Sequence, residues 1–238
     1  MSDRSPAALL NYYINFHRDA NIPDQHIAYL RKMRDELGVA PKVIYDIGAA
    51  VLHWYKNARE IWPAARIIAF EAVREFEPFY KQFGVEYHIG VFSDTPDRTL
   101  AFYNHPICFS GNSYYKENPA HSAAAAHLYP DESAETRVSA TVDAVAFAAA
   151  LPPPDLIKID VQGAELDILR GMPVALKSAQ HLLVELQHIQ YNIGAKLAPE
   201  SIPTIEAMGF RLVKQGDVLD FCGNGPDADY HFLRQDLT

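Results

Sequence analysis

The chain has 238 residues, of which 49% are hydrophobic and 21% charged, a balance typical of one globular α/β domain with a filled core. Its formal net charge of −9 argues against nucleic acid as a partner, because that affinity comes mainly from Lys and Arg. No stretch reaches the roughly 18 apolar residues of a membrane span and the N-terminus has no signal-peptide core, so we expect a cytoplasmic protein without membrane partners.

Along the chain, helix-like and strand-like stretches follow one another. Residues 1–40 are expected to form a helical extension, because Ile22–Leu37 has apolar residues at helical spacing and stops at Gly38. From Pro41 onward the chain alternates short apolar strands with helices. We expect strands at Val43–Asp46, Arg66–Phe70, Val85–His88, Leu156–Asp160, His181–Glu185, Phe210–Lys214 and Tyr230–Arg234. We expect helices at His53–Ile61, Arg74–Phe83, Val142–Ala150, Glu165–Met172 and Pro199–Met208.

This alternation predicts a Rossmann-like, doubly wound α/β fold over residues 41–238, with a mostly parallel seven-stranded sheet. The last two strands follow each other without a helix, which favours an antiparallel hairpin at one edge. The segment Phe109–Glu135 is long and, apart from an alanine run, lacks clear periodicity. Because it joins core strands on the side where ligands bind, we expect it to be a mobile lid over an acceptor pocket.

A possible ligand-binding loop follows the first strand in VIYDIGAAVLHW, Val43–Trp54. Ligands of open parallel sheets bind at the carboxyl ends of strands, where small residues let the backbone approach them. The candidate residues for this contact are Asp46, Gly48, Ala49 and Ala50. Small residues would equally serve a tight turn without a ligand.

Two acidic residues end other strands of the predicted sheet. Glu71 follows RIIAF, where a carboxylate can accept hydrogen bonds from the ribose of a nucleotide cofactor. Asp160 follows DLIKI, where a carboxylate facing the cleft could orient a hydroxyl, hold a metal or take a proton. Each residue could instead cap the helix that follows it.

The ordered motifs make the chain similar to a known family. DLIKIDVQGAELDILRG, Asp155–Gly171, resembles the signature of the FkbM family of S-adenosylmethionine-dependent methyltransferases, and HLLVELQH resembles the strand ending in Glu that follows it. YDIGAA resembles the cofactor loop of the family, IIAFEAV its ribose-binding strand and GVFSD the stretch near the adenine. The resemblance implies S-adenosylmethionine as cofactor, Ser93 and Asp94 on the adenine side, and a carbohydrate or secondary-metabolite hydroxyl as methyl acceptor.

The chain departs from the family pattern at three positions. The usual Asn and second Gly of the cofactor loop are Ala50 and Leu52, and the usual Glu before the signature glycine is Gln162. These departures leave open a non-catalytic binding domain that retains the fold. A nicotinamide-dependent oxidoreductase would share the strand, loop and acidic strand end, but the chain lacks the G-x-G-x-x-G motif.

The remaining candidates concern proton transfer and metal. His188, just past the strand that ends in Glu185, is expected near the cleft, where a neutral imidazole could act as a general base beside Asp160. His53, just past the cofactor loop, is a second candidate of this kind. No zinc motif occurs and no metal is assigned, although Asp160 and Glu185 could hold a divalent cation through carboxylate oxygens.

Overall fold

The computed structural model describes residues 5–122, 124–214 and 227–236. Its centre is a seven-stranded sheet with the strand order β3-β2-β1-β7-β8-β10-β9. The strands are β1 (Val43–Ile47), β2 (Arg66–Glu71), β3 (Glu86–Ile89), β7 (Leu156–Ile159), β8 (His181–Gln187), β9 (Phe210–Lys214) and β10 (Asp227–Arg234). The first five of these pair in parallel, whereas β10 is antiparallel to both β8 and β9. This confirms the predicted mostly parallel sheet with an antiparallel hairpin at its edge.

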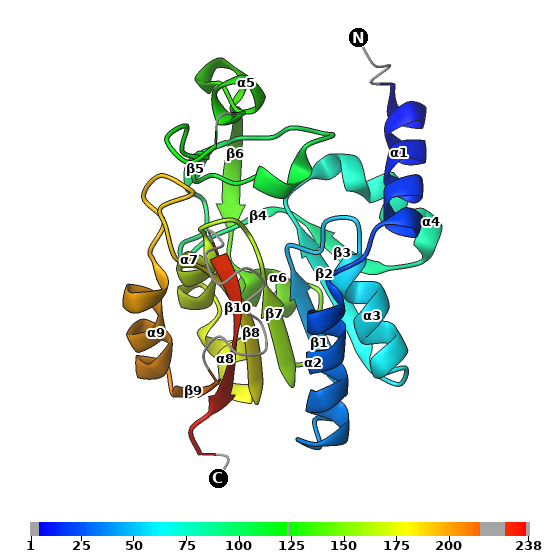
Figure 1. Cartoon of the computed structure of the whole chain (residues 1–238), viewed down its shortest axis with the longest axis vertical. Coiled ribbons are helices and arrows are strands. Elements are labelled where there is room, and N and C mark those ends of the chain that lie inside the picture. The colour runs from blue at the N-terminus through cyan, green and yellow to red at the C-terminus, as the bar shows by residue number, and fades with distance from the viewer. Residues whose placement is uncertain (1–4, 123, 215–226, 237–238) are drawn as a thin grey trace.

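Helices cover both faces of this sheet (Figure 1). They are α1 (Pro6–Asp19), α2 (Asp24–Asp35), α3 (His53–Ile61), α4 (Glu77–Phe83), α5 (Ala125–Leu128), α6 (Val142–Ala148), α7 (Glu165–Arg170), α8 (Pro173–Ser178) and α9 (Ala198–Ala207). Short 3₁₀ turns occur at η1 (Arg74–Phe76), η2 (Phe109–Gly111) and η3 (Asp131–Ser133). Among the helices of the described ranges, none is long and apolar enough to cross a bilayer.

The two faces of the sheet are packed differently because side chains alternate along each strand. In β1, Ile44 packs with α2 and α3, while Tyr45 and Ile47 point to the cluster that contains α6 to α9. In β7, Leu156 likewise faces α2 and α3, while Ile157 and Ile159 face the other way. Even-numbered positions of β1 and β7 therefore share the face that α2 covers.

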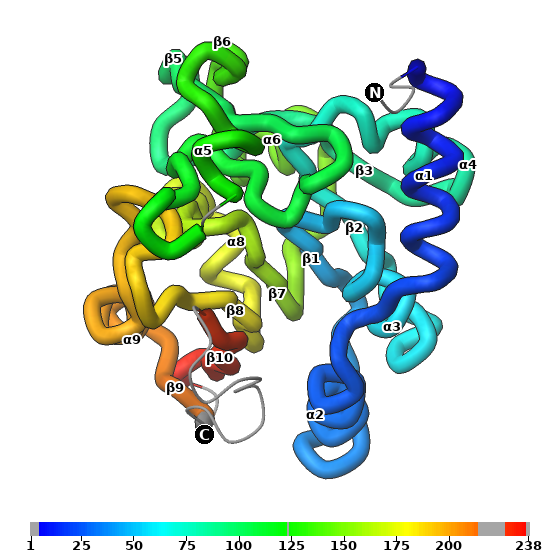
Figure 2. Tube along the Cα trace, turned by 45° about the horizontal axis from the view of Figure 1, so that its top comes forward, coloured from blue at the N-terminus to red at the C-terminus, as the bar shows by residue number. Residues whose placement is uncertain are grey.

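A second, three-stranded sheet lies beyond the ends of the central strands (Figures 1 and 2). It has the order β4-β6-β5 and consists of β4 (Val91–Phe92), β5 (Thr99–Phe102) and β6 (Glu135–Ala140). The sequence did not predict β6, because the residues that it buries are Arg137 and Ser139 rather than apolar ones. Ser139 Oγ accepts a hydrogen bond from the amide of Arg98, and Arg137 Nη2 donates one to the Ala72 carbonyl.

The N-terminal region forms two helices within the helical extension predicted at 1–40; α2 lies at the predicted helix Ile22–Leu37, whereas the position of α1 was not predicted. Tyr13 of α1 is fully buried against Phe76 and Phe79 and donates a hydrogen bond to the Pro106 carbonyl at 2.8 Å. Both helices therefore pack on the central domain along one side of the molecule (Figure 2). Most of the predicted connection 215–229 lies outside the described residues.

A buried histidine, His231, and a half-buried one, His181, connect α2 to the sheet. Tyr29 of α2 contacts His231 Nδ1 at 2.6 Å, and His231 Nε2 lies 3.0 Å from Nδ1 of His181. Burial lowers the pKa of His231 to about 3 and the pKa of His181 to about 4. Both imidazoles are therefore neutral in the folded protein at neutral pH.

We predict that the cost of His231→Gln depends on pH. A histidine with a lowered folded-state pKa contributes stability above its ordinary pKa of about 6.5 and loses it as pH falls, because the unfolded chain binds the proton first. The difference in unfolding free energy between wild type and variant should therefore narrow by about 1–2 kcal/mol between pH 7.5 and pH 5. Urea unfolding at both pH values measures it, and a constant difference would contradict the prediction.

Candidate functional site

The loop after β1 passes unusually close to β7. Gly48 has φ of +79°, and a Cβ atom there would lie 1.8 Å from the carbonyl oxygen of Asp160. Only glycine fits, because any side chain would overlap the neighbouring backbone. Ala50 and Leu52 also have positive φ angles, of 43° and 64°. The departures from the family loop thus lie at strained positions that the fold nevertheless accommodates.

Glu71 ties this loop to the end of β2. Its carboxylate accepts hydrogen bonds from the amide of Ala50 at 2.8 Å, of Ala72 at 2.7 Å and of Val73 at 2.9 Å. Burial raises the pKa of Glu71, although these hydrogen bonds oppose the increase. The side chain therefore organises the loop and still borders the cavity described next.

A cavity of about 550 Å³ opens at the carboxyl ends of β1, β2 and β7. This volume is in the range of small-molecule and cofactor sites. Its wall includes the loop at Gly48–Val51, the end of β2 at Glu71–Val73, the α1–α2 region around Phe16–Pro23, and the segment Ile107–Tyr114. Residues far apart in the sequence therefore enclose one site.

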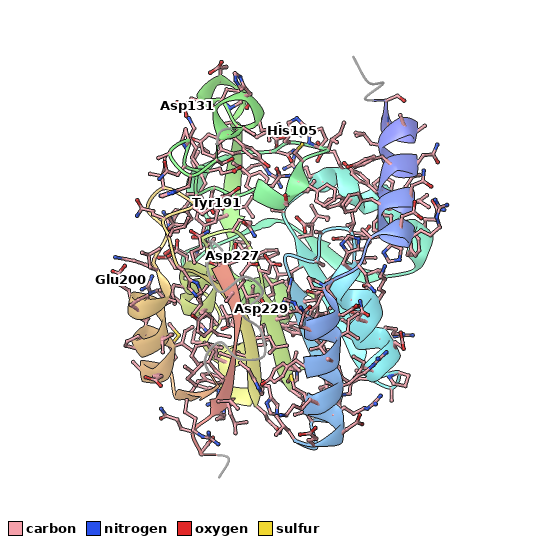
Figure 3. All side chains as sticks on the ribbon, viewed as in Figure 1. His105, Asp131, Tyr191, Glu200, Asp227 and Asp229 are labelled. Atoms are coloured by element: carbon pink, nitrogen blue, oxygen red, sulfur yellow. The ribbon has the colours of Figure 1, made fainter. Side chains whose placement is uncertain are left out.

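One side of the cavity carries acidic groups from successive strands. Glu185 of β8 lies opposite Asp229 of β10 in the register of the two strands. Both residues line the cavity together with Asp160 and Lys158 of the β7 segment. Figure 3 shows Asp227 and Asp229 together on β10, near the middle of the molecule. From α2, His26 Nδ1 lies 2.9 Å from Asp229 Oδ2. Alternation along the strands explains why these polar residues share one face.

Lys158 is the central cation of this cluster. Its buried ammonium lies 3.2 Å from Asp160 Oδ2, 3.8 Å from Asp46 Oδ1 and 3.4 Å from the Gly48 carbonyl. Burial alone would lower the pKa of Lys158, but the neighbouring carboxylates raise it above its ordinary value. Among the described residues that line the cavity, Lys158 is the only Lys or Arg.

The surroundings shift the pKa values of the carboxyl groups in opposite directions. Burial alone would raise the pKa of Asp160, but the ammonium of Lys158 and hydrogen bonds hold it below its ordinary value. Burial and the charge of Asp160 raise the pKa of Glu185 well above its ordinary value. Burial likewise raises the pKa of Asp46 to about 6, against the opposing charge of Lys158.

Five predicted site residues meet at the cavity, namely Gly48, Ala49, Ala50, Glu71 and Asp160. Asp46 lies outside the lining, fully buried below the loop, and neither of its carboxylate oxygens has a hydrogen-bond partner among the described residues. His53, the second histidine candidate, also lines the cavity, where burial lowers its pKa.

Three predicted site residues are not brought to the cavity lining. Ser93 is buried and, with Asp94, contacts Arg98, whose Nη1 lies 2.7 Å from Asp94 Oδ1. His188 is exposed, and its Nε2 lies 2.8 Å from the hydroxyl of Tyr230. The strand ends before His188, so the chain carries it outward; its catalytic role and the adenine contact of Ser93 and Asp94 stay predictions.

Several lining residues were missed by sequence reasoning, namely Phe16, His26, Lys158, Gln162 and Asp229. For Lys158 and Asp229 a signal existed, since a charged residue at alternate positions of the apolar stretches LIKID and DADYHF marks one face of a strand. For Phe16 and His26 no local signal existed, because α1 and α2 reach the cavity only through packing.

The predicted lid, Phe109–Glu135, is held by many side-chain contacts. The ring of Phe109 packs edge-on against Tyr13 and Phe16 of α1. Tyr115 donates a hydrogen bond to Asp167 at 2.8 Å, and its carbonyl accepts one from Asn192 at 2.8 Å. The segment thus covers one side of the cavity, and its mobility stays a prediction.

Comparison with known proteins adds three findings. Among solved structures, the chain is similar to a precorrin-6y C5,15-methyltransferase from Geobacter metallireducens (TM-score 0.47, 13% identity, covering 91% of this chain and 90% of that one). It is also similar to a 1,6-didemethyltoxoflavin-N1-methyltransferase from Burkholderia thailandensis (TM-score 0.43, 12% identity, covering 99% and 93%). Among curated proteins, it is 31% identical over 77 residues to the hexuronic acid methyltransferase AglP of Haloferax volcanii, and the match covers 32% of each protein. The match thus spans about a third of that relative.

A family model also matches the chain. The model described as the methyltransferase FkbM domain matches residues 46–212 of the chain, which is well over half of its length. This range contains the loop at Gly48, the carboxylates of Glu71, Asp160 and Glu185, and most of the cavity wall.

Proposed function

Because the chain belongs to the FkbM methyltransferase family, whose members use S-adenosylmethionine, we propose that it transfers a methyl group from this cofactor to a hydroxyl oxygen of a small-molecule or glycan acceptor. The observation that carries the proposal is the single cavity that holds both the loop at Gly48 and the carboxylate of Asp160. A cofactor on the loop and an acceptor beside Asp160 would then share one enclosed space.

The residues at the loop fit S-adenosylmethionine. The absence of a side chain at Gly48 lets the loop pack against Asp160 and border the cavity at the carboxyl end of β1. The carboxylate of Glu71 borders the cavity with three accepted hydrogen bonds, and a carboxylate has about four lone-pair sites, which leaves one for a ribose hydroxyl. Asp46 supplies buried negative charge below the loop, on the side where we place the cationic amino-acid end of the cofactor.

The chemistry requires mainly positioning and a route for one proton. S-adenosylmethionine supplies a methyl group that its sulfonium has already activated. The residues of this chain would hold the acceptor hydroxyl beside Asp160, whose carboxylate is kept ionised by Lys158 at 3.2 Å. The oxygen–methyl bond forms as the sulfur–methyl bond breaks, and the hydroxyl proton passes to Asp160.

The charges of the cavity favour a neutral hydroxyl over a carboxylate as the reacting group. Asp160, Glu185 and Asp229 line the acceptor side, and the lone ammonium of Lys158 is already paired. A second carboxylate brought there would meet like charge in a partly desolvated site. We therefore propose a neutral hydroxyl as the reacting group, whereas AglP is named for a hexuronic acid.

Calorimetry tests this proposal against its two rivals. We expect binding of S-adenosylmethionine and S-adenosylhomocysteine and none of NAD. A screen of neutral glycosides and other hydroxyl-bearing small molecules, with radiolabelled S-adenosylmethionine, then seeks the acceptor. Binding of NAD alone would favour an oxidoreductase. Cofactor binding without transfer to any acceptor would favour a non-catalytic domain.

We predict that Glu71→Gln weakens S-adenosylhomocysteine binding by roughly ten- to a hundredfold, because the amide turns an N–H donor toward the backbone N–H groups that Glu71 now accepts from. Calorimetry of the folded variant measures this loss. Glu75→Gln is the matched control, since Glu75 contacts Asn104 and does not line the cavity. Unchanged affinity in Glu71→Gln would remove Glu71 from the cofactor site.

A further inference from the structure

The side chain of Gln162 lies between two carboxyl groups of the cavity. Its Nε2 lies 3.1 Å from Asp160 Oδ1 and 2.8 Å from Glu185 Oε2. A primary amide has two N–H donors, so these two contacts use both of them. Gln162 thus connects the end of β7 to β8 at the acceptor side of the cavity.

The backbone at Gln162 fixes this arrangement. Gln162 has φ of 56° although it is not glycine, and Gly163 follows with φ of 100°. A Cβ atom at Gly163 would lie 2.8 Å from the Cβ of Ala195, so the turn packs tightly. Glu165 holds it from below, where its carboxylate accepts the amides of Val161 and Gly163 at 3.2 and 3.0 Å. The amide of Gln162 is therefore aimed at the two carboxyls by a rigid turn.

The charges around the two carboxyls do not balance if both are ionised. Lys158 contacts Asp160 at 3.2 Å and also faces Asp46 of β1. Further acidic groups face the pair from β10, where Asp227 and Asp229 lie, and from α7, where Glu165 lies. His26 of α2 is paired with Asp229. The single ammonium of Lys158 thus balances only part of the negative charge of several carboxyls, which favours protonation of either Asp160 or Glu185.

We propose that Gln162 holds Asp160 and Glu185 as a proton-sharing pair, in which Glu185 carries the proton, Asp160 is the carboxylate, and the amide occupies the place of a bridging divalent cation. The division agrees with the pKa of Asp160, which the charge of Lys158 and hydrogen bonds lower against the effect of burial, and with the pKa of Glu185, which burial and the charge of Asp160 raise. The next step rests on the proposed function. Asp160 of the pair receives the proton that the acceptor hydroxyl releases as its oxygen forms the bond to the methyl group.

The proposal gives a role to Gln162, which stands where the family usually has Glu. A glutamate there would replace two N–H donors by a third carboxylate, and three carboxylates around one point need a cation to stay together. With glutamine the same two carboxyls are joined by hydrogen bonds and one proton. Asp160 therefore accepts the hydroxyl proton, and Glu185 and Gln162 are positioning residues that hold its carboxylate.

Titration with Mn²⁺ tests whether the amide of Gln162 occupies the position of a bridging divalent cation. Isothermal calorimetry at pH 7 should show no saturable binding to wild type. Q162E should show saturable binding of one Mn²⁺, and the double variant Q162E/E185Q should lose that binding. Q180E is the matched control, because Gln180 is exposed and precedes the opposite end of β8. Equal affinity in wild type and Q162E, or no binding by folded Q162E, would overturn the proposal.

Infrared difference spectroscopy tests the shared proton. At pH 7 the spectrum of wild type minus E185Q should contain a protonated-carboxyl band, because the variant removes the group that carries the proton. E200Q is the control, since Glu200 lies on α9 at the periphery of the molecule (Figure 3) and a hydrogen bond from Lys196 lowers its pKa. Absence of the band for E185Q would overturn the pair. Neither measurement uses cofactor or acceptor, so failed methyl transfer would leave both results standing.

Discussion

Replacing Gly48 by alanine should abolish S-adenosylmethionine binding and lower the free energy of unfolding by about 2–4 kcal/mol. The new Cβ would lie 1.8 Å from the carbonyl oxygen of Asp160, and the backbone has φ of +79°. Strain of the backbone and overlap with β7 therefore add. Because the loop must move away from β7 to relieve the overlap, it also leaves the position in which it borders the cavity.

Gly84→Ala separates these two effects. Gly84 also has a positive φ, of 62°, but a Cβ atom there has nothing within 4 Å. This variant should show only the cost of strain, about 1 kcal/mol, with unchanged cofactor affinity. Urea unfolding and calorimetry with S-adenosylhomocysteine measure both quantities. If the two variants were destabilised equally, the loop at Gly48 would not be tightly packed against Asp160.

The second large effect concerns Asp160. Asp160→Asn should reduce methyl transfer to the acceptor found by the screen by about 100-fold, the scale of losing a general base. The cofactor affinity should change little, because Asp160 acts on the acceptor rather than on the loop contacts. Asparagine keeps the shape, but it loses the charge that pairs with Lys158 at 3.2 Å and the ability to take a proton.

Asp167→Asn is the matched control for this measurement. Asp167 lies on α7, accepts hydrogen bonds from Tyr114 and Tyr115, and does not line the cavity. It should lose some stability and keep its turnover. If Asp160 only caps a helix, Asp160→Asn should instead keep both its stability and its turnover, since Asn caps about as well as Asp. Near-normal turnover in Asp160→Asn would therefore remove its catalytic assignment.

The sequence by itself determined the central sheet and the part of the site that consists of the loop at Gly48 and the carboxylates of Glu71 and Asp160. The strands β1, β2, β7 and β8 are short apolar stretches, each followed by a helix, so their positions were readable without their partners. Gly48, Glu71 and Asp160 were found because each directly follows such a strand, and carboxyl ends of parallel strands meet at one edge.

Only the tertiary structure decided which other side chains complete the site. Lys158, Glu185 and Asp229 lie on three strands, and their meeting depends on the pairing of β7, β8 and β10. His26 and Phe16 reach the cavity because α1 and α2 pack over it, and β6 escaped notice because it buries polar residues. His188 shows the converse, since it follows the Glu185 strand but is carried outward to Tyr230. Periodicity is a property of neighbours in the chain, whereas a site is made by register and packing between distant segments.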